Sequence, residues 1–173
     1  YAKRSARGEQ HKDLVIHAIK RSLLLLFLGC ALFCIGPGHI TFRFQNVLAQ
    51  LYVTYLVAFL IQRKSFTTQL LVSFAFIAFT ELIYRVFWVP GFNQPFTPDA
   101  NFGAYIDLLI SGELSGGHWV SFNAIPTTAH TIWGVLAGKL LMSDRPASDK
   151  LKRLLIAGII GVAEAGVVNL QEI

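Results

Sequence analysis

The sequence predicts an all-α fold: a polytopic membrane bundle of about five transmembrane helices, with one short helix at the outer membrane surface. Hydrophobic residues make up 54% of the 173 residues and charged residues only 14%, whereas a soluble domain has about 25% charged residues. The apolar residues form continuous stretches without the alternation of a membrane β-barrel. Because lipid offers the backbone no hydrogen bonds, each span is expected to be helical.

Five apolar stretches follow a polar and basic tail at residues 1–21. A helix needs about 20 residues to cross the hydrocarbon core of a bilayer, and the first stretch reaches that length only by extending into the tail. The expected spans are residues 22–36, 44–62, 68–87, 123–142 and 151–170, and the outer loop covers residues 88–118. Residues 22–173 are therefore interpreted as a single transmembrane domain.

Lysine and arginine residues predict the orientation of the spans. All of them except Arg43 and Arg85 lie in the tail, between the second and third spans, or around the hinge between the fourth and fifth spans. These places share one side of the membrane if every stretch spans it. Basic residues mark the cytoplasmic side, so we expect an integral membrane protein with a cytoplasmic amino terminus. This placement accounts for the net charge of +5 without a nucleic-acid partner.

A short amphipathic helix is expected in the outer loop. Its apolar residues recur at the spacing of one helix face, and they are Phe102, Tyr105, Ile106, Leu109 and Ile110. Asp107 lies on another face, with Ala104 and Ser111. The pattern is typical of a helix that lies on a membrane surface. Further along the loop, His118 is interpreted as an interfacial polar residue beside Trp119.

The fourth span carries a polar stripe, and its residues are the candidates for substrate binding. Asn123, Thr127 and His130 fall on one face of a helix with 3.6 residues per turn, in the outer half of the span. His130 has three interpretations: a histidine hydrogen-bonded to another helix, a residue lining a substrate or acyl-donor pocket, and a catalytic base or metal ligand. No second ligand stands at metal-binding spacing, so no metal site is predicted.

Other polar residues within the spans have structural interpretations. Glu81 and Arg85 are four residues apart and are expected to form a local ion pair. Asn46 and Gln50 have the same spacing, which favours hydrogen bonds to another helix. Glu164 has no partner nearby in the sequence, and burial without a countercharge would favour its protonated form.

Four stretches, in this order, resemble the transmembrane acyltransferases related to heparan-alpha-glucosaminide N-acetyltransferase. They are RSLLLLFLG, FRFQNVLAQLYVTYLVAFLI, NFGAYIDLLISGEL and NAIPTTAHTIWGVLAGKLL. The matching positions are Arg43, Val47 and Leu48; Tyr55 to Ala58; Ala104 to Asp107; Pro126; and Gly134 to Gly138. The resemblance implies acyl transfer from acyl-CoA, such as acetyl-CoA, to a sugar amine or hydroxyl at the bacterial inner membrane.

The chain also departs from the family pattern. The family's acyl-accepting histidine lies in an amino-terminal portion that has no counterpart in these residues, so no histidine here is given that role. An Asp-Pro-Glu-Gly run of many members corresponds to Gly117–Val120, which has no carboxylate. Asp107 is the motif carboxylate that survives, and it is the candidate catalytic residue, orienting a substrate hydroxyl or amine. The alternative is that Asp107 caps or solvates the outer helix.

Two functions are consistent with the sequence. The first is a partial or divergent membrane acyltransferase, as the resemblance implies. The second is a non-catalytic accessory subunit of a larger membrane complex, whose first and third spans would bind partner helices, lipid or pigment. A transporter is disfavoured, because the sequence lacks paired broken helices and an inverted repeat.

Overall fold

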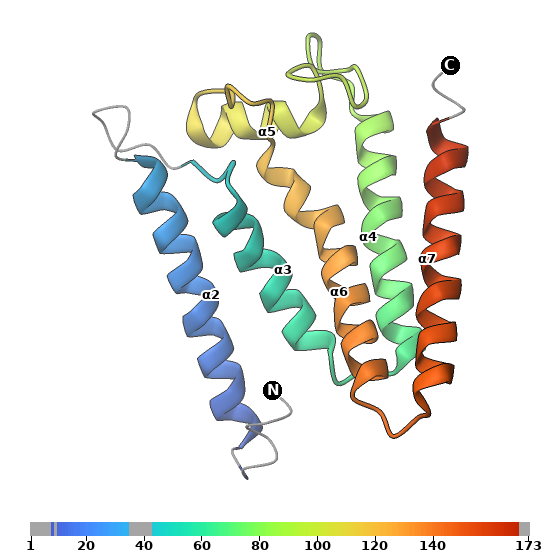
Figure 1. Ribbon diagram of the computed structural model, residues 1–173. Helices are drawn as coiled ribbons and strands as arrows, with labels where there is room; N and C mark the ends of the chain where they lie inside the picture. Colours follow the sequence, from blue (N-terminus) through green and yellow to red (C-terminus); the bar gives the residue numbers. More distant parts are fainter. Residues whose placement is uncertain (1–7, 9, 35–42, 170–173) are drawn as a thin grey trace. The chain divides into compact units, whose positions relative to one another are not determined.

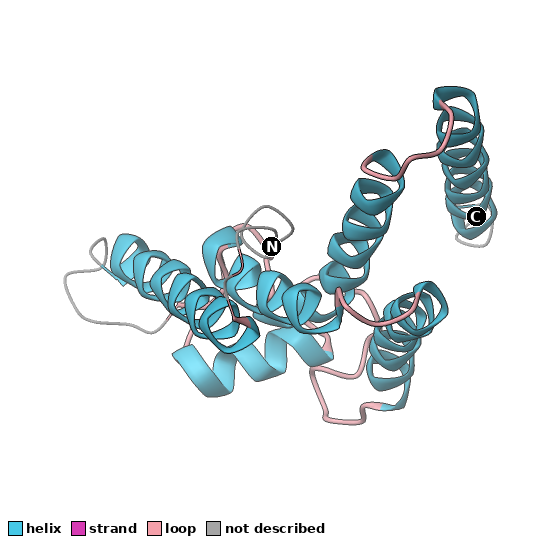
Figure 2. Ribbon diagram, turned by 90° about the horizontal axis from the view of Figure 1, so that it is seen from below, coloured by secondary structure: helices cyan, strands magenta, loops and turns pink. Residues whose placement is uncertain are grey.

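The computed structural model describes the backbone of residues 8, 10–34 and 43–169, and the side chains of residues 8, 10–33 and 43–162. Every regular element in these ranges is a helix, which confirms the all-α prediction (Figure 2). The chain forms two compact units, Tyr1–Trp133 and Gly134–Ile173. Glu164 and the ends of the first and fifth predicted spans lie outside the described side chains.

The described residues of the first unit form four α-helices, a short 3₁₀ helix and the beginning of a fifth α-helix. These elements are α2 (His11–Cys34), α3 (Val47–Ile61), α4 (Phe66–Val86), α5 (Phe102–Ser111), η1 (Ser121–Asn123) and α6 (Ala124–Leu141). Within this unit, α2 and α3 run side by side in opposite directions, and α5 lies across the end at which α3 begins and α4 ends (Figure 1).

Two helices among the described residues, α2 and α4, are long and apolar enough to cross a membrane by length and composition. This is fewer than the five spans expected. Helix α3 has only 15 residues, against the predicted span 44–62. Helix α2 begins at His11, inside the predicted tail, because charged residues such as Asp13 in its first turn are compatible with a helix end.

Side-chain caps decide where three of the helices begin. The amide oxygens of Asn46 and Asn101 accept hydrogen bonds from the third residue of α3 and α5, respectively, and the Ser65 hydroxyl does the same for α4. Such residues satisfy backbone N–H groups that have no partner within the helix. Helix α5 ends at Gly112, whose φ of +73° suits glycine.

Helices α2 and α3 approach closely through small residues. Ala18 and Ser22 of α2 are buried, as is Ala58 of α3. A Cβ atom added at Gly29 would lie 2.7 Å from Asn46 Oδ1, so only glycine fits there without displacing the cap of α3. Packing of this kind is typical of helix pairs in membranes.

The first unit buries polar residues and exposes large apolar ones. The buried polar or charged residues are Ser22, Asn46, Gln50, Thr54, Gln69, Ser73, Thr80, Asn101, Asp107 and Thr128. By contrast, Phe27 of α2 is 70% exposed and Leu82 of α4 is 61% exposed. Soluble proteins also expose apolar atoms, but an extended exposed apolar surface together with a polar interior marks an interaction with lipid or protein.

We call residues 87–123, which include α5 and η1, the α5 cap. Aromatic side chains hold it on the end of α4. The ring of Tyr84 stacks on Phe96 at 5.1 Å and meets Phe102 edge-on at 5.9 Å, while Phe102 and Phe122 lie 4.9 Å apart. Gly103 allows this packing, because a Cβ atom there would collide with the Tyr84 hydroxyl.

The second unit contains the end of α6, from Gly134, and the whole of α7 (Ala147–Asn169). The segment that connects α6 to α7 is rich in basic residues, as the sequence indicates. Arg153 and Arg145 lie 3.0 and 3.1 Å from the Asp149 carboxylate, and they hold the pKa of that carboxyl below its usual value. Lys150 Nζ donates to the Leu141 carbonyl at 2.9 Å, so it satisfies a backbone group at the carboxyl end of α6.

Candidate functional site

Asp107 is a buried carboxylate that joins α5 to the start of η1. Asp107 as a whole is only 2% exposed. The backbone N–H of Ser121 donates to the two carboxylate oxygens at 3.0 and 3.2 Å, and the Ser121 hydroxyl donates to Oδ1. A carboxylate near the first turn of a helix also interacts favourably with the partial positive charge there. Asp107 therefore fixes the position of the segment that leads into α6.

The environment of Asp107 changes its acidity. Burial raises the pKa of the carboxyl above its usual value, while hydrogen bonds from Ser121 and Gln45 act in the opposite direction. Desolvation disfavours the charged form, and donors that point at the carboxylate favour it. The raised pKa means that Asp107 holds a proton more readily than an exposed aspartate does, which suits a group that exchanges a proton with a neighbour.

A polar network continues from Asp107 to the segment before α3. The Ser111 hydroxyl donates to the Asp107 carbonyl at 2.7 Å and accepts from Gln45 Nε2 at 3.3 Å. Arg43 Nε donates to Glu113 Oε1 at 2.6 Å. Two stretches whose contacts join residues 66 and 70 positions apart, around Arg43 and around Asp107, thus meet at one end of the first unit.

An apolar cavity of about 270 Å³ lies beside this network. Helices α2, α3, α5 and α6, together with η1 and Phe44 in the segment before α3, contribute its walls. The lining residues are Leu26, Phe44, Ala49, Tyr52, Val53, Ile110, Ser121 and Ala124. Ser121 connects the two features, because it lines the cavity and its hydroxyl donates to Asp107. An apolar cavity with a few convergent polar groups is typical of a small-molecule site.

The predicted substrate-binding stripe lies on a different face of α6. Asn123 and His130 are exposed and Thr127 is half-buried, whereas Thr128 and Ile132 are buried. The Asp107 carboxylate accepts hydrogen bonds from Ser121 and Gln45, and none comes from a residue of the stripe. The structure therefore leaves Asn123, Thr127 and His130 available to a polar molecule, but does not bring them together with Asp107.

His130 packs against an aromatic side chain. Its ring meets the Trp133 ring edge-on at 5.2 Å, and Trp133 Nε1 donates to the Ser73 hydroxyl at 2.8 Å. This contact connects α6 to α4 within the first unit. The described residues contain no group of three or more His, Cys, Asp or Glu side chains that could hold a metal ion.

Other polar predictions have mixed outcomes. Glu81 and Arg85 form the expected ion pair along α4. The interhelical hydrogen bonds expected of Asn46 and Gln50 are not formed: Asn46 caps its own helix and donates to the Arg43 carbonyl, and Gln50 Nε2 has no partner. A residue just before a helix is well placed to cap it, which explains why Asn46 bonds locally.

Ser121 is the residue of this site that the sequence motifs do not single out. Its partner Asp107 is 14 residues away, and a lone serine before a helix usually indicates only a cap.

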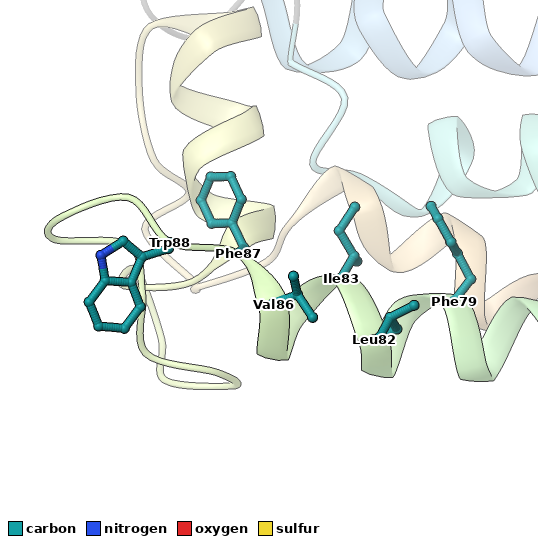
Figure 3. Close-up of a pocket in the computed structure, with 6 residues that line it drawn as sticks. All are labelled: Phe79, Leu82, Ile83, Val86, Phe87 and Trp88. Carbon is teal, nitrogen blue, oxygen red and sulfur yellow. The ribbon is translucent and has the colours of Figure 1, made fainter.

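Residues at the end of α4 line a second hollow of about 350 Å³, formed by apolar side chains from Phe79 to Trp88 (Figure 3). No family model, curated protein or solved structure matches the chain.

Proposed function

We propose that this chain is part of an integral-membrane acyltransferase that transfers an acyl group from an acyl-CoA thioester to an amine or hydroxyl of a sugar. The observation that carries the proposal is the buried Asp107 carboxylate, bound to the Ser121 hydroxyl at the wall of an apolar cavity. The cavity suits the acyl group, and the carboxylate and hydroxyl suit the polar reacting atoms. The resemblance of the sequence to membrane acyltransferases points to the same chemistry.

The distribution of residues supports a bilayer as the surroundings. Only 22% of the apolar window of α2 and 11% of that of α4 is buried, whereas the core helix of a soluble protein is mostly buried. Polar side chains lie on the packed faces instead. We extend this to about five spans with the amino terminus in the cytoplasm, because lysine and arginine cluster as the positive-inside rule requires. The α5 cap then faces the outside.

Asp107 and Ser121 would orient the acceptor. Displacement of a reacting group by about 1 Å can lower a rate by about 10²-fold. A sugar is polar, and the exposed stripe of Asn123, Thr127 and His130 offers hydrogen bonds to it. In this proposal the sugar occupies the polar surface and the acyl group enters the cavity.

A second candidate function is a non-catalytic subunit of a membrane complex. It is favoured by the apolar faces of α2 and α4, which could bind partner helices, and by the way Asp107 uses its hydrogen bonds within the chain. In that case Asp107 is a structural cap that fixes η1.

Acyl transfer by the protein in lipid nanodiscs separates the two functions. The protein is purified from its native membrane with any associated subunits and given acetyl-CoA and glucosamine, and release of free CoA and formation of acetylated sugar are measured. We expect Asp107→Asn to lower the rate by about 10²-fold, because the acceptor is no longer held in position. Asp149→Asn, which alters a partly exposed carboxylate of the second unit, is the matched control and should leave the rate unchanged.

Folding of each variant is checked by thermal unfolding. If the wild-type protein transfers no acyl group, the acyltransferase proposal is wrong. A stable complex with other subunits would then support the accessory function. If Asp107→Asn folds normally and retains the full rate, Asp107 has no part in the chemistry.

A further inference from the structure

A histidine–carboxylate pair lies in the α5 cap, separate from the Asp107 site. His118 Nδ1 and Asp99 Oδ2 are 2.6 Å apart and come from loops on opposite sides of α5 in the sequence. The side chain of His118 is 59% exposed and that of Asp99 is 37% exposed. An exposed ion pair contributes little to stability. A contribution to stability therefore does not account for the contact between His118 and Asp99.

The backbone holds both partners in unusual conformations. Asp99 has a φ of +60° and His118 a φ of +57°, and nearby Phe96 has a φ of +58°. Aspartate and histidine adopt such values more readily than most residues, whereas for Phe96 they are costly. Backbone strain of this kind costs about 1–3 kcal/mol per residue, persists only where the surroundings enforce it, and clusters at functional sites.

Anchored turns enforce these conformations. Gln94 N donates to the Ala100 carbonyl at 3.0 Å, and Asn101 Nδ2 donates to the Thr97 carbonyl at 2.6 Å. His118 N donates to the Ser115 carbonyl at 3.0 Å. The loop that carries Asp99 is also tied to α4, because Phe96 stacks on Tyr84. The imidazole and the carboxylate are therefore presented to each other by two well-connected turns.

The contact decides which imidazole nitrogen is basic. When the Nδ1 proton of a neutral histidine is donated to a carboxylate, the lone pair is left on Nε2. The carboxylate also stabilises the imidazolium that forms when Nε2 accepts a proton. Residues 88–118 contain no lysine or arginine; the cation over the Phe96 ring is Arg85, which pairs with Glu81. Asp99 is thus the charged group in direct contact with His118.

His118 is close in the sequence to a residue that lines the cavity. His118 is three residues before Ser121, and a chain extends by at most about 3.6 Å per residue. The two Cα atoms are therefore within about 11 Å of each other. Ser121 lines the cavity and binds Asp107. The loop that carries His118 therefore leads directly into the cavity wall at Ser121.

We propose that His118 is a general base for the acyl acceptor, an amine or hydroxyl, and that Asp99 is its positioning residue. The proposal rests on the proposed acyl transfer. Nε2 of His118 takes the proton of the acceptor while the acceptor's nitrogen or oxygen bonds to the thioester carbonyl carbon. The carbon–sulfur bond then breaks, and the thiolate leaves with the proton from the His118 imidazolium. No oxidant or reductant is needed.

The first test measures the pH dependence of acyl transfer from acetyl-CoA to glucosamine in nanodiscs. The wild-type rate should rise with pH, because a general base acts only in its unprotonated form. His118→Gln should lower the rate by about 10²-fold and remove this rise. Asp99→Asn should retain part of the rate, because the imidazole remains but the carboxylate no longer orients it. His17→Gln, at an exposed position of α2, is the matched control.

The second test uses readouts that do not need CoA. Nitrogen-15 NMR of labelled histidine should show the Nδ1–H tautomer for His118 in the wild-type protein and its loss in Asp99→Asn. Hydrolysis of p-nitrophenyl acetate, an activated ester, should fall to the buffer rate in His118→Gln.

The outcomes separate this proposal from the proposed function. If acyl transfer is absent but ester hydrolysis depends on His118, the proposed acyltransferase function is wrong, and the assignment of His118 as a general base is supported. If His118→Gln folds normally and both reactions keep the wild-type rate and pH profile, the proposal is overturned. It is also overturned if the neutral ring carries its proton on Nε2. Equal loss of thermal stability in His118→Gln and Asp99→Asn, with unchanged pH profiles, would show that the pair only fastens the loops.

Discussion

The α2–α3 pair and the α5 cap bury polar side chains in opposite ways. In the pair, Ser22 Oγ, Gln50 Nε2 and Thr54 Oγ1 are buried without hydrogen-bond partners, and close approach of small residues holds the helices together. In the cap, the buried groups Asn101 and Asp107 are bonded to backbone or side-chain donors and acceptors.

This difference indicates which region depends on hydrogen bonds of defined geometry. A buried group with no partner loses the hydrogen bond it had with water, which costs about 1–3 kcal/mol. The α2–α3 contact can therefore be improved by apolar substitutions, whereas the α5 cap can only be damaged by them. Directional bonds are concentrated where Asp107, Ser121 and the His118–Asp99 pair lie, as a site of defined geometry requires.

The largest effect is expected from adding a methyl group at the two crowded glycines. In Gly103→Ala the new Cβ would collide with the Tyr84 hydroxyl and lie 2.8 Å from Val120 Cγ2; we expect a loss of about 3 kcal/mol. In Gly29→Ala the nearest atom is Asn46 Oδ1 at 2.7 Å, and the loss should be smaller, about 1–2 kcal/mol.

The measurement is thermal or denaturant unfolding in detergent. Gly138→Ala is the control, because a Cβ there has nothing within 4 Å and alanine favours a helix. Equal stability of Gly103→Ala and the wild-type protein would contradict the tight packing of α5 on α4.

The next largest effect is expected at the asparagine that caps a helix in each of the two regions. Asn46 and Asn101 each accept from the third residue of a helix and donate to an upstream carbonyl. Either change to alanine should cost about 1–2 kcal/mol. Asn101→Ala should also release the loop that holds Asp99, so ester hydrolysis should fall in this variant and not in Asn46→Ala. The conservative Asn101→Asp keeps the capping oxygen and should recover most of the stability.

A smaller effect of opposite sign is expected at Thr54 of α3. Its side chain is 1% exposed and its hydroxyl has no partner, so Thr54→Val should stabilise the protein by about 1 kcal/mol. Thr128 is equally buried, but its hydroxyl donates to the Ala124 carbonyl at 2.7 Å. Thr128→Val should be neutral or destabilising. If the two substitutions have the same effect on the unfolding midpoint, the contrast between satisfied and unsatisfied hydroxyls is wrong.

The smallest expected effect is a pH dependence of stability at Asp107. Burial raises the pKa of this carboxyl in the folded protein, so between its unfolded pKa of about 3.9 and its folded pKa the folded state binds more protons than the unfolded state. Stability contributed by this group is therefore greatest at low pH and is lost as the pH rises through the folded pKa.

Asp107→Asn lacks this titration. The difference in unfolding midpoint between the wild-type protein and Asp107→Asn should favour the wild-type protein most near about pH 4 and decrease toward neutral pH. A difference that grows with pH would mean that hydrogen bonds from Ser121 outweigh burial and that the carboxyl pKa is lowered.

Several features follow from the sequence by itself. Helical structure follows from continuous apolar stretches, and the extent of α4 follows the stretch predicted at 68–87 with little change. Helix α5 covers the amphipathic pattern from Phe102, because its spacing allows one regular structure. The ion pair of Glu81 and Arg85 depends only on residues one turn apart. These predictions succeed because each depends on interactions within a single helix.

The tertiary structure decided which groups meet and which helix faces are inside. Sequence spacing groups Asn123, Thr127 and His130 on one face of α6, but the packed face is that of Ala124, Thr128 and Ile132. Both faces mix small, polar and apolar residues, so hydrophobicity does not distinguish them.

The contacts of Asp107 with Ser121 and of His118 with Asp99 join residues 14 and 19 positions apart through turns. Periodicity within a helix carries no information about such contacts. They are set by the close packing of α5 against α4 and η1, which only the folded chain provides.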